Sequence, residues 1–333
     1  MKVAVFDTHR FERPAFEAAN VRFQHELTFL EPRLTAQTVA LAAGHRAVCA
    51  FVNDRLDAEV LGRLHGLGVA LVALRSAGFD HVDLRAASAH GLPVVRVPGY
   101  SPHAVAEHAV ALLMALNRKT HRAYARVREW DFSLDGLVGF DLYGKTVGVL
   151  GTGRIGAAAA QIFAGFGCQV LACDALPDAA LAASVPLEYV ALDALLARAD
   201  VVSLHLPLND STRHLMDAAR LARMKRGAVL INTGRGGLVD AAALLDALKS
   251  GQLSAAGLDV YEKEAGLFFS DHSEEAPQDP VLAQLLSFPN VLVTAHQAFL
   301  TREALANIAD TTLANIAAFE QGQAPPPNQV EAK

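Results

Sequence analysis

Three ionisable side chains of different chemistry follow three apolar, strand-like segments in the second half of the chain. Arg235, Glu264 and His296 each come shortly after one of these segments. Parallel α/β sheets bind their ligands beyond the carboxyl ends of the strands, so these side chains are candidates for one site. An arginine binds a carboxylate in forked geometry, a histidine delivers a proton near neutral pH, and a carboxylate keeps that histidine protonated and oriented. Hydride reduction of a 2-oxo acid needs these three groups.

Each residue also has an ordinary structural interpretation. An arginine after a strand is commonly a surface or capping residue, and His296 is one of 13 histidines. Glu264 competes with Glu262 in the same loop. Residue types alone therefore leave the assignment open.

A glycine-rich turn is the strongest local motif. Residues 145–150 are typical of a buried strand, which runs directly into Gly151-x-Gly153-x-x-Gly156 and then into an alanine-rich helix. The first glycine permits the tight turn, the second lets the backbone approach a pyrophosphate, and the third allows close helix–strand packing. The free N–H groups at the helix start would bind the phosphates. The predicted phosphate-binding residues are Gly151, Gly153, Arg154, Ile155 and Gly156.

Asp174 follows the next predicted strand, residues 169–173, at the place where a ribose-binding carboxylate belongs. It would accept hydrogen bonds from the ribose hydroxyls and repel a 2′-phosphate, which favours NAD over NADP. The alternative is a glycine-rich turn followed by an incidental aspartate.

Two series of alternating strands and helices must position these groups. The first contains predicted strands at residues 3–6, 47–51, 70–74 and 94–97, and predicted helices at 11–19, 35–43, 58–67 and 84–90. A long helical pattern at 105–122 separates it from the second series, with strands at 145–150, 169–173, 201–204, 228–231, 255–258 and 291–294. A last helix at 302–321 precedes a proline-rich tail. Such alternation predicts an α/β protein with two doubly wound parallel sheets, and only the second series has a phosphate-binding loop.

Composition excludes several classes of function. The 333 residues are 52% hydrophobic and 19% charged, as in a globular protein of two domains. The net charge of −6, without a basic cluster, argues against a nucleic-acid partner. Cys49, Cys168 and Cys173 have no CxxC spacing, so we expect reduced thiols and no metal site. No apolar run is long enough for a membrane span, and no signal peptide is recognisable, so the expected location is cytoplasmic.

Taken together, the motifs resemble the D-isomer-specific 2-hydroxyacid dehydrogenase family, most nearly its fermentative D-lactate dehydrogenases. The resemblance runs almost from end to end. Besides the glycine loop, it rests on residues 75–83, 97–102, 105–108, 205–208, 232–237, 259–262 and 296–299.

The resemblance implies roles for individual residues. Arg235, Glu264 and His296 occupy the family's catalytic positions, and Glu264 is preferred because the family's acid lies three residues after Tyr261. Asp259 would be a second acid that supports Arg235 and the nicotinamide end. The residues implied to line the cofactor cleft are Pro207, Thr233 and Asp259, and the backbone N–H groups at Ala77 and Gly78 would bind the substrate carboxylate.

Three aromatic residues would surround the far end of the substrate. By resemblance, Phe51, Tyr100 and Phe299 form a small apolar wall that fits a methyl group. The alternative is that Phe51 and Phe299 are ordinary core residues. The chain departs from many relatives at Gly234, which replaces a serine before the catalytic arginine, and at Gly99, but neither change removes a reacting group.

The resemblance also implies the domain organisation. Residues 1–100 and 300–333 would form a discontinuous, flavodoxin-like catalytic domain, and residues 101–299 a Rossmann NAD-binding domain, with a cleft that closes on substrate. The expected activity is reduction of pyruvate to D-lactate with NADH by a homodimer or tetramer. Two alternatives stay open: a reductase of larger or aromatic 2-oxo acids, and a non-catalytic dinucleotide sensor that binds partners.

Overall fold

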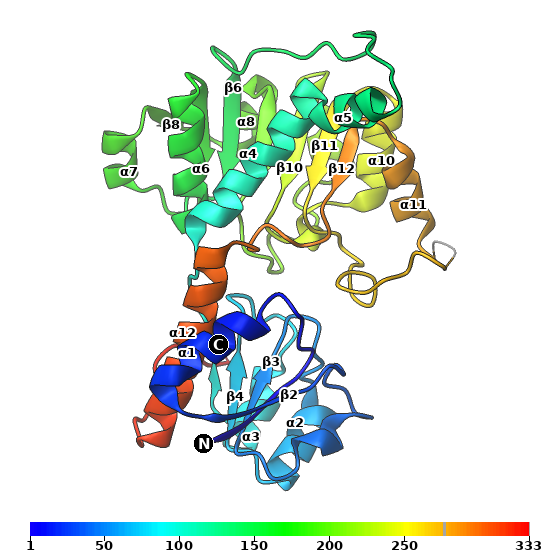
Figure 1. Ribbon diagram of the computed structural model, residues 1–333. Coiled ribbons are helices and arrows are strands. Elements are labelled where there is room, and N and C mark those ends of the chain that lie inside the picture. The colour runs from blue at the N-terminus through cyan, green and yellow to red at the C-terminus, as the bar shows by residue number, and fades with distance from the viewer. Residues whose placement is uncertain (276–277, 333) are drawn as a thin grey trace. The chain divides into compact units, whose positions relative to one another are not determined.

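The computed structural model describes residues 1–275 and 278–332 (Figure 1). The chain divides into two compact units. Unit 1 combines Met1–Ser101 with Leu300–Lys333, and unit 2 is Pro102–Phe299. Each unit is built on its own β-sheet.

Unit 1 contains a six-stranded sheet of order β13-β5-β4-β3-β1-β2. The strand pairs are parallel except for the last short strand, β13, which pairs antiparallel with β5. The strands are β1 (Lys2–Val5), β2 (Glu26–Phe29), β3 (Ala47–Ala50), β4 (Leu71–Leu74), β5 (Val94–Val95) and β13 (Gln329–Val330). The central strands are fully buried, as expected for a sheet covered on both faces.

Helices cover both faces of this sheet. Helices α1 (Arg13–Phe23) and α12 (Arg302–Glu320) lie side by side and pack on one face through Phe16, Leu313 and Ile316 (Figure 1). The other face is covered by the elements α2 (Ala58–Gly66), α3 (Leu84–Ala89) and η1 (Val39–Ala42). The C-terminal helix thus belongs to the core of the N-terminal sheet.

The helix predicted for residues 35–43 does not form. Only the 3₁₀ turn η1, Val39–Ala42, is present. The hydroxyl of Thr38 accepts a hydrogen bond from the backbone N–H of Thr35 at 2.9 Å and donates one to the carbonyl of Arg33 at 2.5 Å. These local side-chain bonds compete with the backbone bonds that an α-helix requires.

Unit 2 contains a seven-stranded parallel sheet of order β12-β11-β10-β9-β6-β7-β8. The strands are β6 (Thr146–Leu150), β7 (Gln169–Cys173), β8 (Leu187–Tyr189), β9 (Val201–Leu204), β10 (Ala228–Asn232), β11 (Leu253–Leu258) and β12 (Val291–Val293). The helices are α4 (Pro102–Arg118), α5 (Thr120–Arg128), α6 (Arg154–Gly165), α7 (Ala179–Ser184), α8 (Leu192–Arg198), α9 (Ala218–Arg223), α10 (Ala241–Lys249) and α11 (Pro280–Ser287), with a 3₁₀ turn η2 at Gly236–Leu238.

Two apolar layers sandwich this sheet. Helices α4 and α6 pack on one face, and α8, α9, α10 and α11 on the other. The predicted helix 105–122 is interrupted at Lys119, whose φ of +51° ends α4 and starts α5. Helix α5 has no buried residue.

Strands β10, β11 and β12 are adjacent and parallel. Their carboxyl ends therefore meet at one edge of the sheet, and the loops with Arg235, Glu264 and His296 all begin there. In the part of the chain that the structure describes, no helix is long and apolar enough to cross a membrane. The same residues contain no cluster of His, Cys, Asp and Glu that could hold a metal ion.

Candidate active site

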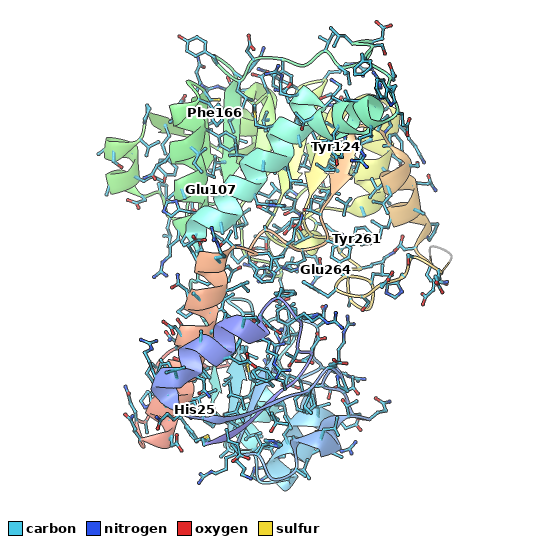
Figure 2. The ribbon with its side chains drawn as sticks, in the orientation of Figure 1. His25, Glu107, Tyr124, Phe166, Tyr261 and Glu264 are labelled. Carbon is cyan, nitrogen blue, oxygen red and sulfur yellow. The ribbon has the colours of Figure 1, made fainter. Side chains whose placement is uncertain are left out.

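Glu264 and His296 form an ion pair although 32 residues separate them in the sequence. Nδ1 of His296 lies 2.7 Å from Oε1 of Glu264, and both side chains are about one-fifth exposed. The second carboxylate oxygen, Oε2, accepts the backbone N–H of Tyr261 at 2.9 Å, which fixes the carboxylate. Both residues are labelled in Figure 2. With Nδ1 held in this way, Nε2 is the nitrogen left to exchange a proton with a ligand.

The competing acid, Glu262, has a different partner. Its Oε2 lies 2.8 Å from Nε2 of His214. Two glutamates two residues apart in one loop thus each hold a separate histidine, and Glu264 is the one at His296.

The loop that carries His296 is held by Asp259, which is 1% exposed. The carboxylate of Asp259 accepts the backbone N–H groups of Gln297 at 2.8 Å and Ala298 at 2.9 Å. Its backbone carbonyl accepts the N–H of His296 at 2.5 Å. Ala295 and His296 both have positive φ, +49° and +61°. These bonds compensate for a conformation that residues other than glycine rarely adopt.

A partly buried histidine on helix α4, His108, extends this network. The hydroxyl of Thr294 donates to Asp259 at 2.6 Å and lies 2.9 Å from Nε2 of His108. Burial lowers the pKa of His108, and the Asp259 carboxylate only partly opposes this effect. A neutral His108 can donate through Nε2 to Thr294, so α4 is tied to the His296 loop through Asp259.

Arg235 lies in the loop between β10 and η2. Asn232, at the end of β10, accepts the N–H of Gly234 at 3.1 Å and donates to the carbonyl of Arg235 at 2.9 Å. A Cβ on Gly236 would lie 2.0 Å from the backbone of Tyr261. Only glycine permits this close approach, which places the Arg235 loop against the loop of Glu264.

The predicted phosphate loop has the expected geometry. Gly151 has a φ of +89°, and a Cβ on Gly156 would meet the carbonyl oxygen of Gly151 at 1.8 Å. By contrast, nothing lies within 4 Å of a Cβ built on Gly153, the N-cap of α6. The loop is therefore tightly packed at its two ends and open in the middle, where Arg154 and Ile155 begin the helix.

Asp174 is held at the end of β7 by donors from the glycine loop. Its Oδ2 accepts the backbone N–H of Thr152 at 2.6 Å and the Thr152 hydroxyl at 3.1 Å, and its Oδ1 accepts the N–H of Leu176. Burial alone would raise the pKa of Asp174, but these bonds outweigh it and lower the pKa. The hydroxyl of Tyr189 donates to Thr152 at 2.9 Å and steadies this arrangement.

The other predicted cofactor residues lie along the same edge of the sheet. Thr233 is buried, and its hydroxyl has no hydrogen-bond partner among the described residues. Pro207 is exposed after β9. His205 directly follows β9. Burial lowers its pKa to about 4, and its Nε2 lies 2.9 Å from the Ser203 hydroxyl.

The predicted carboxylate-binding loop, Ala77 and Gly78, belongs to unit 1. The carbonyl of Ala77 accepts a hydrogen bond from Arg96 at 2.7 Å, and the carbonyl of Gly78 accepts one from the Ser76 hydroxyl at 2.7 Å. In a trans peptide the N–H points opposite to the C=O. The N–H groups of Gly78 and Phe79 therefore point away from these partners.

Phe51 lies above a buried ion pair in unit 1. The guanidinium of Arg75 is 4.7 Å from the centre of the Phe51 ring and bonds to both carboxylate oxygens of Glu12, at 2.8 and 3.0 Å. It also donates to the carbonyls of Phe6 and Asp7 just beyond β1. Phe51 itself is 4% exposed and donates its N–H to Asp54.

The remaining predicted substrate residues are distributed between the units. Tyr100 belongs to unit 1, where its carbonyl accepts a hydrogen bond from Asn307 at 2.7 Å. Phe299 is the last residue of unit 2 and is partly exposed.

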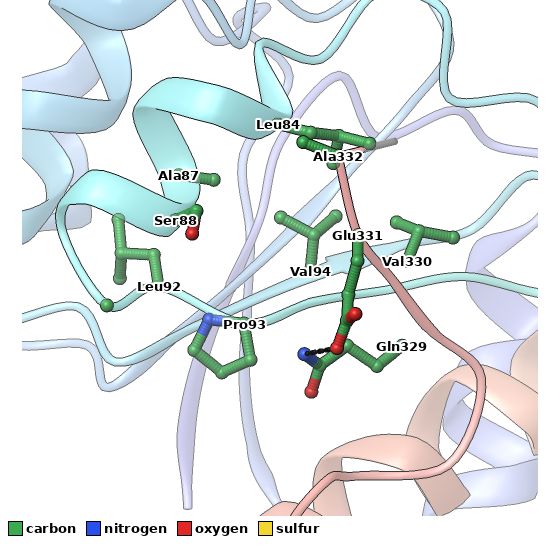
Figure 3. Close-up of a pocket in the computed structure, with 11 residues that line it drawn as sticks. Leu84, Ala87, Ser88, Leu92, Pro93, Val94, Gln329, Val330, Glu331 and Ala332 are labelled. Atoms are coloured by element: carbon green, nitrogen blue, oxygen red, sulfur yellow. Dashed lines mark hydrogen bonds between the residues drawn. The ribbon is translucent and has the colours of Figure 1, made fainter.

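A separate pocket of about 500 Å³ lies in unit 1 between α3, β5 and β13 (Figure 3). Apolar side chains line it together with the polar side chains of Ser88, Gln329 and Glu331. None of the predicted site residues lines it, so it is distinct from the candidate active site.

The sequence did not point to several residues around the candidate groups. Phe269 packs on the His296 ring, Tyr189 supports Thr152, and Glu12 pairs with Arg75. No local pattern indicates these contacts, because each joins residues that are far apart in the sequence.

Comparison with known proteins identifies the family. The family model that describes the NAD-binding domain of D-isomer-specific 2-hydroxyacid dehydrogenases matches residues 110–298 of this chain. The 2-hydroxyacid dehydrogenase homolog 1 of Schizosaccharomyces pombe is 51% identical over 320 residues, 96% of each chain. The D-lactate dehydrogenase of Escherichia coli is 48% identical over 326 residues, 98% of this chain and 99% of that protein.

A solved structure agrees with these sequence relatives. The structure described as the pyruvate reductase of Chlamydomonas reinhardtii superposes with a TM-score of 0.93 at 49% identity and covers 98% of each chain. Both parallel-sheet units are therefore shared with known members. The chain belongs to the D-isomer-specific 2-hydroxyacid dehydrogenase family and is an NAD-dependent oxidoreductase.

Proposed function

We propose that this enzyme is a D-lactate dehydrogenase that reduces pyruvate with NADH. The observation that carries the proposal is the Glu264–His296 pair, with a 2.7 Å contact at Nδ1 and backbone bonds that fix the loop. Two relatives support the substrate, since one is a D-lactate dehydrogenase and another a pyruvate reductase, each nearly half identical to this chain.

Three side chains would handle the substrate. Arg235 would bind the pyruvate carboxylate with its two-pronged guanidinium. His296 would donate the proton on Nε2 to the carbonyl oxygen, which becomes the hydroxyl of lactate. Glu264 would hold Nδ1, so that the imidazole keeps its orientation and its positive charge is balanced before the proton leaves.

The residues of unit 2 fit NADH. The open space over Gly153 at the start of α6 suits a pyrophosphate, the fixed Asp174 carboxylate suits the ribose hydroxyls, and the buried Thr233 hydroxyl has capacity for a ligand bond. NADH supplies the hydride when bound. Arg154, Ile155, Pro207 and Asp259 complete the proposed cofactor residues.

Unit 1 would contribute the substrate-specific contacts, and unit 2 the cofactor. The N–H groups of the Ala77–Gly78 loop would supplement Arg235 at the carboxylate. Phe51, Tyr100 and Phe299 would limit the side chain of the substrate to a methyl group. The fixed position of Phe51 supports this assignment, because its ring contacts both the Arg75 guanidinium at 4.7 Å and the His9 ring, whose centre lies 5.5 Å away.

A panel of 2-oxo acids assayed with NADH tests the substrate. We expect a higher kcat/KM for pyruvate than for branched 2-oxo acids or phenylpyruvate, because a clash with a fixed ring discriminates strongly. Phe51→Ala should shift the ratio toward phenylpyruvate. A wild-type preference for phenylpyruvate would favour the alternative, a reductase of aromatic 2-oxo acids.

Replacement of the proton donor tests the mechanism. His296→Ala should lower kcat for pyruvate by ~10²–10⁴-fold, the range for a general acid. NADH binding, followed by fluorescence titration, should persist. An unchanged kcat would contradict the assignment of His296.

We also propose that the enzyme is a homo-oligomer. Helix α5 has no buried residue, and the segment after it exposes Trp130 (82%), Leu134 (79%) and Val138 (83%). Tyr124 of α5, labelled in Figure 2, is also exposed. Large apolar side chains that gather on an exposed surface are typical of an interface. The expected partner is a second copy of this chain. The expected location of the enzyme is cytoplasmic.

Molar mass in solution tests the oligomer. Light scattering should give a dimer or a tetramer, and Trp130→Glu with Val138→Glu should shift the enzyme toward monomers. A wild-type enzyme that is monomeric at micromolar concentration would refute the proposed interface.

A further inference from the structure

The loop that carries Glu264 also carries a phenylalanine in a strained conformation. Phe269 has a φ of +66°. This left-handed region is unfavourable for any residue with a Cβ, and a bulky side chain there is uncommon. Glycine and asparagine adopt it readily, so the backbone alone gives no reason for an aromatic residue at this position.

The side chain of Phe269 supplies a reason. Its ring centre lies 5.8 Å from that of His296, with 40° between the ring planes. The preceding residue, Phe268, is 6% exposed and belongs to the apolar core of unit 2. Phe269 is partly buried and packs against the same core, but its ring also contacts the imidazole of His296.

The loop positions both groups that contact His296. The carbonyl of Glu264 accepts the backbone N–H groups of Leu267 at 2.9 Å and Phe268 at 3.0 Å, which forms a compact turn between Glu264 and Phe269. One end of this turn supplies the carboxylate at Nδ1, and the other supplies the ring.

A single hydrogen bond does not fix an imidazole. The contact between Nδ1 and Glu264 defines the position of one ring atom, but the ring can still tilt about that contact. Tilting moves Nε2, the atom on the opposite side, by the largest amount. A proton transfer requires a donor–acceptor distance of about 2.6–3.2 Å, so such a tilt impairs the transfer.

We propose that Phe269 is a positioning residue that packs on the imidazole of His296 and thereby fixes the direction of Nε2. This inference rests on the proposed role of His296 as proton donor. It explains why the chain keeps a strained phenylalanine at a position where asparagine or glycine would relieve the backbone, since strain is retained at sites where the side chain has a function.

Phe269→Asn removes the aromatic ring without adding backbone strain, because asparagine tolerates the left-handed conformation. The variant therefore tests the ring alone. We expect kcat for pyruvate to fall about tenfold or more, as a small misplacement of a reacting group can cost up to ~10². The KM for NADH should stay unchanged, and the melting temperature should not fall. The solvent deuterium isotope effect on kcat should increase, because proton transfer becomes slower relative to the other steps. Phe269→Tyr, which keeps the ring, should stay within about twofold of the wild type.

The outcomes separate this inference from the proposed function. If the wild type reduces pyruvate, His296→Ala is inactive and Phe269→Asn is fully active, the inference on Phe269 is overturned while the proposed function stands. The inference is also overturned if kcat falls together with a lower melting temperature or a higher KM for NADH, while the isotope effect does not increase. That result would indicate a structural role for Phe269. If the wild type reduces no 2-oxo acid, both fail.

Discussion

Two ion pairs with nearly equal contact distances lie in the two units and differ in burial. In unit 1, Arg75 and Glu12 are 0% and 4% exposed, and their closest contact is 2.8 Å. In unit 2, His296 and Glu264 are 19% and 21% exposed at 2.7 Å. The first pair is sealed from water, whereas the second can be reached by a small ligand.

The cations differ in the same sense. Burial would lower the pKa of Arg75, but Glu12 raises it further, so this guanidinium stays charged at every accessible pH. An imidazole, in contrast, exchanges its proton near neutral pH. The permanent charge of Arg75 joins the ends of β1, β3 and β4 beneath Phe51, whereas the His296 imidazole is a group that can pass a proton to a ligand. The distance between the partners does not distinguish these functions, whereas burial and the type of cation do.

Removing one partner of the buried pair should have the largest effect on stability. Arg75→Met leaves the Glu12 carboxylate buried without its cation, which typically costs about 3–5 kcal/mol in the free energy of unfolding. Denaturant-induced unfolding measures this loss. The double variant Glu12→Leu with Arg75→Met should recover part of it, because no charge is then left buried. If the double variant is as unstable as the sum of the single variants, the pair is not the main source of the loss.

The two glutamates of the unit 2 loop give a matched test of the exposed pair. Glu264→Gln should lower kcat by about 10- to 10²-fold, less than the loss of the acid itself, because the amide still accepts a hydrogen bond but carries no charge. Glu262→Gln removes an equal charge two residues away, at His214. It should change kcat less than about twofold. Equal effects of the two variants would mean that the loop as a whole, and not the His296 contact, matters.

A third histidine sharpens the comparison because its ring faces the Ser203 hydroxyl instead of a carboxylate. Burial lowers the pKa of His205 to about 4, against ~6.5 in an unfolded chain. The folded protein therefore binds fewer protons, so stability falls as the pH decreases from about 6.5 toward 4. His205→Gln should reduce this acid sensitivity by an amount on the order of 1 kcal/mol. Melting temperatures of both proteins between pH 7 and 4.5 measure it, and parallel curves would contradict the prediction.

Much of unit 2 was predictable because its signals are local. Gly151 needs a positive φ and Gly156 has no space for a Cβ, so glycine is required at both positions. The parallel strands place the loops of Glu264 and His296 at the carboxyl edge of the sheet. The choice between Glu262 and Glu264, however, depended on the resemblance to the family. The structure adds a physical reason, since only Glu264 lies at His296.

The unpredicted features depend on contacts between distant residues. The pattern at 35–43 has helical periodicity, but the Thr38 hydroxyl bonds the Arg33 carbonyl and only a 3₁₀ turn forms. No propensity indicates a positive φ at Phe269, because the conformation is imposed by its surroundings. The end of α4 at Lys119 is likewise invisible in the apolar pattern, which continues past it.

The arrangement around Asp259 affects how mutagenesis at this position must be interpreted. Its carboxylate accepts from two backbone N–H groups and one hydroxyl. In Asp259→Asn, the amide NH₂ would face at least one of these donors, so the loop with His296 would have to move. A loss of activity in that variant would report the displaced proton donor together with the missing charge, and could not be equated with the electrostatic contribution of Asp259. Thr294→Val removes one hydrogen-bond donor to Asp259 and leaves the Asp259 carboxylate in place. It is therefore a cleaner probe of the Asp259 side chain.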